Sequence, residues 1–139
     1  MPDAIKVCVY GIPKPQPRPR AFRRGNHAAV YNPDTADAWK KGISAALAEL
    51  EITKPIEHPV AVSMKFLMPR PKRLMRKADP DGEILHAGTP DADNLAKAVM
   101  DVCTGSIWID DGQVADLFVQ KRYAAKDAPS GMILIVMEM

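Results

Sequence analysis

The chain has few cysteines, few histidines and no long apolar run. Its two cysteines, Cys8 and Cys103, lie in apolar stretches, and the N-terminus lacks the basic and then apolar segments of a secretory signal. We therefore expect both cysteines to be reduced core residues of a cytoplasmic protein. No apolar run reaches the ~18 residues of a transmembrane helix, so we expect no membrane partner. The 139 residues contain no internal repeat and predict a single domain over 1–139.

Charged residues are common but unevenly placed. Residues 1–77 hold 15 Lys and Arg against 6 Asp and Glu, a net charge of +9, whereas residues 78–139 hold 4 against 11, a net charge of −7. One interpretation is that the first half attracts a polyanion while the second half holds cations. The alternative is that the two halves neutralise each other within one fold. Charge alone leaves both open.

Hydrophobic periodicity predicts two main helices and a set of strands in the order β-α-β-α-β-β. Helices are predicted at 33–50 and 90–103, where apolar side chains recur every three or four residues, with Asn32 as the N-cap of the first. Alternating or continuous apolar runs predict strands at 5–10, 27–31, 60–68, 107–109, 114–123 and 132–137. The last run is apolar throughout and is predicted to be central. This order favours an α/β (α+β) domain with a mixed β-sheet packed against the helices.

Two basic segments are predicted to be irregular. Residues 13–25 contain four prolines, which favour an extended, polyproline-like arm before a turn at Gly25 and Asn26. Residues 70–88 lack periodicity and predict a mobile loop. Both segments are candidates for DNA binding, and solvated loops are the alternative. The cations concerned are Arg18, Arg20, Arg23, Arg24, Arg70, Lys72, Arg73, Arg76 and Lys77.

The most informative stretch is residues 90–113, which crowds five aspartates around one lysine. Like charges a few Å apart repel, so such a cluster is typical of a site for a cation, and a hard divalent metal suits oxygen ligands. The residues are Asp91, Asp93, Lys97, Asp101, Asp110 and Asp111.

Backbone geometry limits how these side chains can cooperate. Residues i and i+2 lie about 200° apart on a helix but point the same way on an extended segment, so Asp91 must precede the first helical turn if it works with Asp93. The alternative is that either aspartate simply caps the helix. Lys97 lies four residues from both Asp93 and Asp101, which also fits a surface ladder of salt bridges.

Asp110 and Asp111 are neighbours after a strand and therefore point to opposite faces. One can join Asp91 and Asp93 while the other caps a turn or orients a ligand. The alternative is an ordinary D-D-G turn. Of the three histidines, only His86 lies near this stretch, where it either approaches the site or faces solvent from a loop.

Together these residues resemble the RusA family of Holliday junction resolvases, found in bacteria and often in prophages. The resemblance is carried by Asp91-x-Asp93-Asn94-x-x-Lys97, then Trp108-x-Asp110-Asp111-x-Gln113-Val114, then a strand with Lys121. Its specific part covers about residues 89–123. Thr89, Ala92 and Gly112 depart from residues common in the family, and none replaces a catalytic group.

The resemblance implies a RusA-like fold and a homodimeric, magnesium-dependent endonuclease that nicks four-way junction DNA in recombination and repair, with Mn²⁺ as a substitute. It assigns catalysis and metal binding to Asp91, Asp93 and Asp111, a weaker metal role to Asp110, catalysis to Lys97 and DNA binding to Lys121. The implied reaction is metal-assisted hydrolysis in which water attacks phosphorus in line with the leaving 3′ oxygen. A non-catalytic nucleic-acid-binding protein and a nuclease for other branched or flap DNA are the alternatives.

Overall fold

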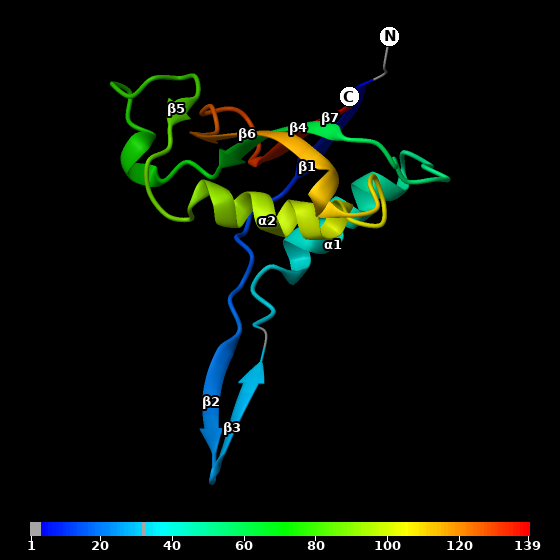
Figure 1. Cartoon of the computed structure of the whole chain (residues 1–139). Coiled ribbons are helices and arrows are strands. Elements are labelled where there is room, and N and C mark those ends of the chain that lie inside the picture. Colours follow the sequence, from blue (N-terminus) through cyan, green and yellow to red (C-terminus); the bar gives the residue numbers. More distant parts are fainter. Residues whose placement is uncertain (1–3, 32) are drawn as a thin grey trace.

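A five-stranded mixed sheet forms the body of the protein in the computed structural model, which describes residues 4–31 and 33–139 (Figure 1). The strand order is β1-β7-β4-β6-β5, and neighbours are antiparallel except for the parallel pair β4 and β6. The strands are β1 Ala4–Tyr10, β4 Val60–Met68, β5 Ile84–Leu85, β6 Val114–Tyr123 and β7 Gly131–Glu138. The predicted mixed sheet is confirmed, and the apolar strand β7 lies inside it.

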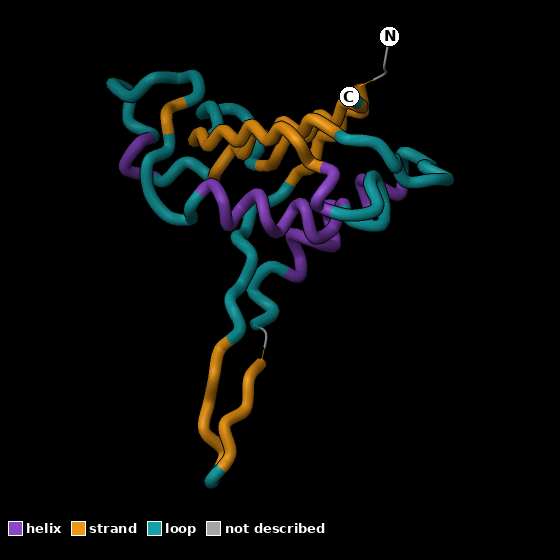
Figure 2. Tube along the Cα trace, in the orientation of Figure 1, coloured by secondary structure: helices purple, strands orange, loops and turns teal. Residues whose placement is uncertain are grey.

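Two helices, α1 (Asp37–Ala48) and α2 (Ala92–Cys103), cover one face of this sheet (Figures 1 and 2). Each buries one apolar stripe, represented by Ile43 on α1 and Leu95 on α2, in one core cluster with the inward side chains of β4. Those inward residues alternate along β4, and all five are at most 5% exposed: Val60, Val62, Met64, Phe66 and Met68. The core is therefore the single layer between the sheet and the helices.

Within residues 4–31 and 33–139, the opposite face of the sheet carries no helix (Figure 1). Cys8 lies there and is exposed, because Val7 and Val9 on either side of it point into the core. The expectation that Cys8 is a core residue is therefore wrong, whereas Cys103 is fully buried. Both thiols are free.

The helix α2 connects the two parallel strands β4 and β6, which need a long crossover. Its first turn follows the loop before Asp91, and its end leads to a 3₁₀ turn, η2 (Asp111–Gln113), directly before β6. This connection brings the two motif segments of the sequence to neighbouring positions in space. A second 3₁₀ turn, η1 (Lys72–Leu74), lies in the loop after β4.

A separate hairpin of β2 (Arg20–Arg24) and β3 (His27–Tyr31) projects from the body (Figure 1). The predicted strand 27–31 and the turn at Gly25 and Asn26 are confirmed, but the extended arm ends sooner than predicted. Residues 20–24 pair with β3 as a strand, and the stretch before them contains neither helix nor strand.

Two further predictions differ from the structure. The first helix begins at Asp37, and Ala36 precedes it without a side-chain cap bond; the predicted N-cap Asn32 lies outside the described residues. Residues 107–109 do not form a strand, because Trp108 makes only isolated bridges to Ile56 and Thr104. Among the described residues, no helix has the length and apolar character needed to cross a membrane.

Candidate functional site

Asp91 stands immediately before α2 in an extended conformation, with φ −70° and ψ 148°. The helix begins at Ala92, so Asp91 precedes the first turn and Asp93 lies within it, as the argument from side-chain direction required. The Asp91 side chain makes no capping hydrogen bond. Capping therefore does not account for this carboxylate.

The first turns of α2 and the start of β6 together form an acidic hollow that contains one lysine. Asp93, Lys97 and Asp111 all line it, and its apolar wall includes Leu117 and Val119. Lys97 is exposed and forms no salt bridge within the described part of the chain. The hollow thus presents two carboxylates and an ammonium group to a ligand.

Asp91 lines a different groove. There it lies with Lys14 from the proline-rich segment and with Thr89 and Asn94 on either side of it in sequence. The backbone N–H of Gln16 donates to the Asn94 carbonyl oxygen at 2.9 Å, which attaches the proline-rich segment to α2. The structure therefore joins Asp93, Lys97 and Asp111, and it leaves Asp91 beside the base of the basic arm.

The Asp111 carboxylate is oriented from behind by two donors. The indole N–H of the fully buried Trp108 donates to Asp111 Oδ1 at 3.0 Å, and the Thr104 hydroxyl donates to the same oxygen. Burial, with a further contribution from Asp111, raises the pKa of the neighbouring Cys103 thiol to about 12, so this thiol stays neutral. Thr104 and Trp108 were not predicted to be site residues, although the Trp-x-Asp-Asp spacing contained the signal.

Asp110 and Gln113 fix the turn that carries Asp111. Asp110 Oδ2 accepts from the Gly112 N–H at 2.9 Å, and Gln113 Oε1 accepts from the Ile109 and Asp110 N–H groups at 2.9 and 2.8 Å. This is a reciprocal capping box, which D-x-x-Q spacing can indicate in sequence. Asp110 is therefore engaged in the turn, which disfavours its weaker metal assignment.

Lys121 does not lie on an open DNA-binding surface. Its ammonium group donates to the carbonyl oxygens of Gly88 at 2.5 Å and Pro90 at 2.8 Å, the residues on either side of Thr89. It therefore holds the segment that leads into Asp91, which differs from its predicted DNA contact. His86 packs against Tyr123 with ring centroids 4.5 Å apart, and burial and the Lys121 charge lower its pKa.

The alternative of a salt-bridge ladder along α2 is not found among the described residues. Asp101 pairs with Lys40 of α1 at 3.7 Å between Lys40 Nζ and Asp101 Oδ2, so its partner lies on the neighbouring helix. Asp101 therefore forms its ion pair with α1, and we do not assign it to the same function as Lys97.

Arg70 is also used within the fold. Its guanidinium group donates to the carbonyl oxygens of Ala124 at 3.0 Å, Leu74 at 3.1 Å and Pro80 at 2.6 Å, and also to that of Gly82. These four bonds organise the loop after β4, so Arg70 has a structural role in the fold, whereas DNA binding was predicted for it. The other cations of this loop remain exposed: Lys72, Arg73, Arg76 and Lys77.

The carboxylates fit a metal ion that needs only a small set of protein ligands. Within residues 4–31 and 33–139, no group of three or more His, Cys, Asp or Glu side chains lies in an arrangement that could hold one. Mg²⁺, however, keeps several waters and is commonly held by one or two carboxylates together with substrate phosphates. The shared hollow of Asp93 and Asp111 supplies that smaller set of oxygen donors.

An exposed acidic hollow with a lysine, beside a projecting basic arm, would suit a protein that acts on the phosphodiesters of nucleic acids. The particular family follows from comparison. The family model "Endodeoxyribonuclease RusA" matches residues 11–133, which is most of the chain, and the protein belongs to that family. It is also similar to "Uncharacterized protein YqaN" of Bacillus subtilis (strain 168), with 32% identity over 136 residues, covering 94% of this chain and 96% of that protein.

Proposed function

We propose that the protein is a magnesium-dependent endonuclease that resolves four-way DNA junctions by paired, symmetric nicks. One observation carries the proposal: Asp93, Lys97 and Asp111 share one exposed hollow in a chain of an endodeoxyribonuclease family. Two carboxylates beside a cation suit the binding of a metal and a phosphate together.

Each residue has a distinct proposed role. Asp93 and Asp111 would hold the metal, Mg²⁺ or Mn²⁺, and Asp91 would supply a further oxygen from its own groove. Bound Mg²⁺ would supply a water of lowered pKa and offset charge at the reacting phosphate. Lys97 neutralises the scissile phosphate, while Trp108 and Thr104 keep Asp111 in position.

The substrate and the assembly follow from symmetry. A four-way junction presents two equivalent strands, and one active site cuts one strand, so paired nicks call for a homodimer with twofold symmetry. Exposed cations of the arm and of the loop after β4 bind the DNA backbone: Arg18, Arg20, Arg23, Arg24, Lys72, Arg73, Arg76 and Lys77. We expect this activity in the cytoplasm, in recombination and repair.

The test is nicking of a synthetic four-way junction with and without Mg²⁺. Wild type is expected to nick only with Mg²⁺, and Asp93→Asn is expected to lose at least 100-fold in rate while retaining junction binding in Ca²⁺. Asp101→Asn is the matched control, since Asp101 contacts Lys40 outside the hollow and should keep its activity.

Other results would choose between the remaining functions. Equal behaviour of wild type and Asp93→Asn would leave a non-catalytic nucleic-acid-binding protein. Nicking of linear duplex as readily as of the junction would instead indicate a nuclease for other branched or flap DNA. Sedimentation of wild type gives the assembly state, and a monomer that resolves junctions would contradict the proposed dimer.

A further inference from the structure

The β2–β3 hairpin is a separate structural unit. Its two strands pair only with each other, over five residue pairs from Arg20 with Tyr31 to Arg24 with His27. All five residues of β2 are exposed. Figures 1 and 2 show the hairpin as an arm that leaves the body below the helices and points away from the sheet. The arm therefore adds surface to the molecule without filling its core.

The turn of the arm is built for a tight hairpin. Gly25 has φ +62° and is followed by Asn26, the arrangement of a two-residue type II′ turn with glycine first. Such turns match the twist of paired strands, so the ribbon forms locally. An isolated two-stranded hairpin is only marginally stable in water. An arm that buries so little of itself is suited to gaining contacts from a partner.

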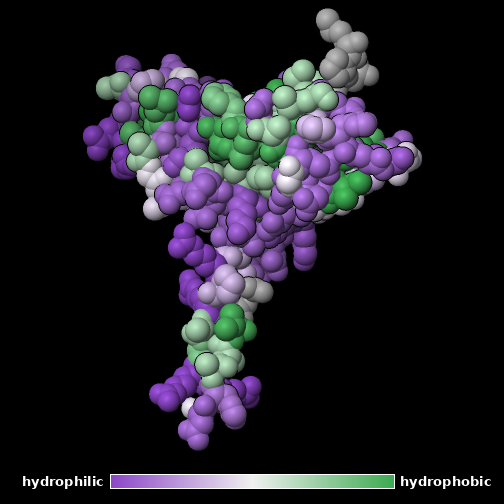
Figure 3. All heavy atoms as spheres, in the orientation of Figure 1, coloured by the Kyte–Doolittle hydropathy of each residue, from purple (hydrophilic) through white to green (hydrophobic). Residues whose placement is uncertain are grey.

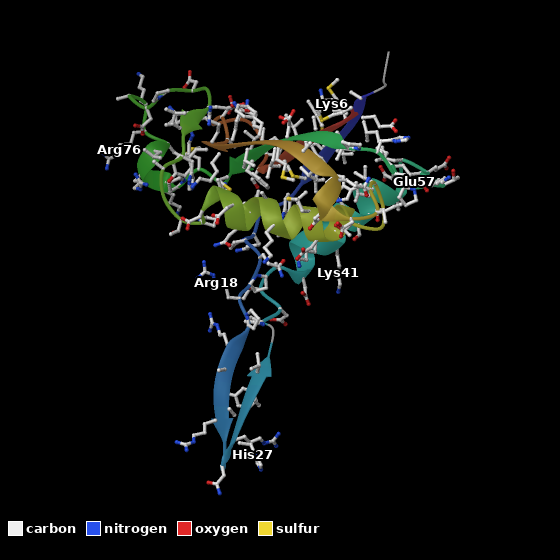
Figure 4. All side chains as sticks on the ribbon, viewed as in Figure 1. Lys6, Arg18, His27, Lys41, Glu57 and Arg76 are labelled. Atoms are coloured by element: carbon white, nitrogen blue, oxygen red, sulfur yellow. The ribbon has the colours of Figure 1, made fainter. Side chains whose placement is uncertain are left out.

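The charge of the arm defines the chemistry of that partner. Residues 4–31 contain no Asp or Glu, while Arg18 and Arg20 lie at the base of the arm and Arg23, Arg24 and His27 lie near its tip. Figure 4 shows Arg18 at the base and His27 at the tip. A surface of this kind attracts a polyanion.

An apolar band separates the two cationic ends. Figure 3 shows hydrophobic residues along the middle of the arm and hydrophilic residues at its tip and base. The residues of the band are Ala21, Phe22, Ala28, Ala29 and Val30. Val30 is 68% exposed and Phe22 is 42% exposed, so the band is accessible. A surface that bound a polyanion through charge alone would not need this apolar band.

The spacing of these features fits a DNA groove. At about 3.3 Å per residue, the four steps from Arg20 to Arg24 span about 13 Å, close to the ~12 Å width of the major groove, which admits a two-stranded β-ribbon. In that position the cations at each end meet phosphates on the two walls. Arg20, Phe22 and Arg24 alternate along β2 and therefore share one face of the ribbon, so Phe22 then faces the base edges, where thymine methyl groups offer apolar contact.

We propose that this arm is a β-ribbon that enters the major groove of a duplex DNA arm away from the cut. Resting on the proposed function, the inference adds a second contact that makes binding depend on the length of the duplex arm. The tip points away from α2 and β6, which form the acidic hollow, so a short duplex would reach the hollow without reaching the tip (Figure 1). The ribbon is separable from catalysis.

The experiment compares wild type with Arg23→Gln/Arg24→Gln on four-way junctions whose duplex arms are 6 or 20 base pairs long. Binding is measured in Ca²⁺ and nicking in Mg²⁺, each across a salt series. Lys6→Gln/Lys41→Gln is the matched control, since it removes two exposed charges from the body (Figure 4). A Phe22→Ser variant tests the apolar contact alone.

On long arms, the double arginine variant is expected to bind about tenfold more weakly, with a salt slope smaller by about 1.8 for two lost phosphate contacts. On short arms, wild type and the variant should bind equally and nick at the same rate. The lysine control should behave as wild type on both. Phe22→Ser should weaken long-arm binding without changing the salt slope.

Two results would overturn the inference. The first is a double arginine variant with the same length dependence and salt slope as wild type. The second is a difference in sedimentation between the double arginine variant and wild type, which would show that the arm binds a second copy of the chain. If wild type nicks no junction, only the catalytic proposal fails. The proposal for the arm can still be tested, because binding of wild type and the double arginine variant to a 20-base-pair linear duplex does not require nicking.

Discussion

At the scale of single residues, the proposed site depends on side chains that hold its carboxylates in place. Asp111 is useful only in one orientation, and Trp108 and Thr104 set it through the same carboxylate oxygen. Gln113 then ties the turn to the body, since its amide donates to the carbonyl oxygens of Ile56 at 2.7 Å and His58 at 3.0 Å. Such outer contacts are commonly as important to a site as the ligands.

Lys121 gives the first prediction at this scale. Lys121→Met removes the donor to the Gly88 and Pro90 carbonyl oxygens and so loosens the segment before Asp91. We expect the Mg²⁺ concentration for half-maximal nicking to rise by about 10-fold, in the range found for outer-shell changes. Junction affinity in metal-free buffer should change less than twofold.

The opposite pattern would show a DNA contact for Lys121. In that case Lys121→Met would lower junction affinity without metal and reduce the salt slope by about 0.9. Lys121→Arg is the conservative control, because it keeps a charged donor at the same place. Circular dichroism of each variant separates loss of position from loss of fold.

The second prediction concerns pH and Cys103. Burial raises the pKa of this thiol from 9.0 to about 12, so the unfolded chain releases its proton at lower pH than the folded one. The stability that the protonated Cys103 thiol contributes to the folded protein is fully present below pH 9 and is lost as the pH rises toward 12. The difference in unfolding free energy between wild type and Cys103→Ala should shrink by about 1.4 kcal/mol from pH 8 to pH 10.

Urea unfolding at the two pH values measures that difference, and a constant difference would contradict the raised pKa. A thiol reagent gives an independent check. The exposed Cys8 should react in the folded protein, whereas Cys103 should react only after unfolding.

At the scale of elements, the loop after β4 shows how cations can organise backbone. Residues 70–88 have no hydrophobic pattern, but Arg70 donates to four carbonyl oxygens from different parts of the chain. Lys126 adds donations to the Arg76 and Asp79 carbonyl oxygens at 2.7 and 2.9 Å and pairs with Asp81 at 3.3 Å. Charge counted along the sequence therefore overstated the surface available to DNA.

The third prediction is that Arg70→Gln destabilises this loop. Charge-assisted hydrogen bonds contribute about 1.5–3 kcal/mol each when buried, and this partly buried set should cost about 1–3 kcal/mol in total. Urea unfolding measures the loss, and limited proteolysis should show new cleavage between Lys72 and Gly82. The salt slope for junction binding should stay unchanged.

Arg73→Gln is the control for Arg70. Arg73 is exposed and reaches only the Tyr123 hydroxyl, at 3.5 Å, so its loss should leave stability within about 0.5 kcal/mol of wild type. If Arg70→Gln reduced the salt slope while stability stayed constant, Arg70 would be a DNA contact after all.

At the scale of the whole molecule, the protein divides into a packed body and an exposed arm. The core lies between one sheet face and two helices, and the buried cluster contains residues of the body only. Because nearly every described residue of the arm is exposed, the arm and the body should respond separately to substitution.

The fourth prediction follows from this division. Replacing residues 21–30 by Asn-Gly shortens the arm to its first pair, Arg20 with Tyr31, with a turn suited to two residues. The unfolding midpoint of the body should move by no more than about 2 °C, since no core side chain is removed. Differential scanning calorimetry measures it, and a larger drop would show that the arm supports the body.

Several elements could be predicted from sequence because their signals are local. The alternation of Val60, Val62 and Met64 is a direct consequence of one buried face, and the bounds of β4 follow from it. The position of Asp91 before α2 follows equally from chain geometry. Where long-range contacts compete, prediction failed: residues 107–109 were predicted to be a strand, but Trp108 makes isolated bridges only.

The sequence by itself determined the chemistry of this protein: carboxylates and a lysine at fixed spacing, a basic first half and the residues of its family. Only the tertiary structure decided which of these groups meet. Asp93, Lys97 and Asp111 face one hollow because the crossover between β4 and β6 folds α2 back beside the start of β6. Arg70 and Lys121 turn inward because carbonyl oxygens distant in sequence need donors there, and local sequence does not encode those distances.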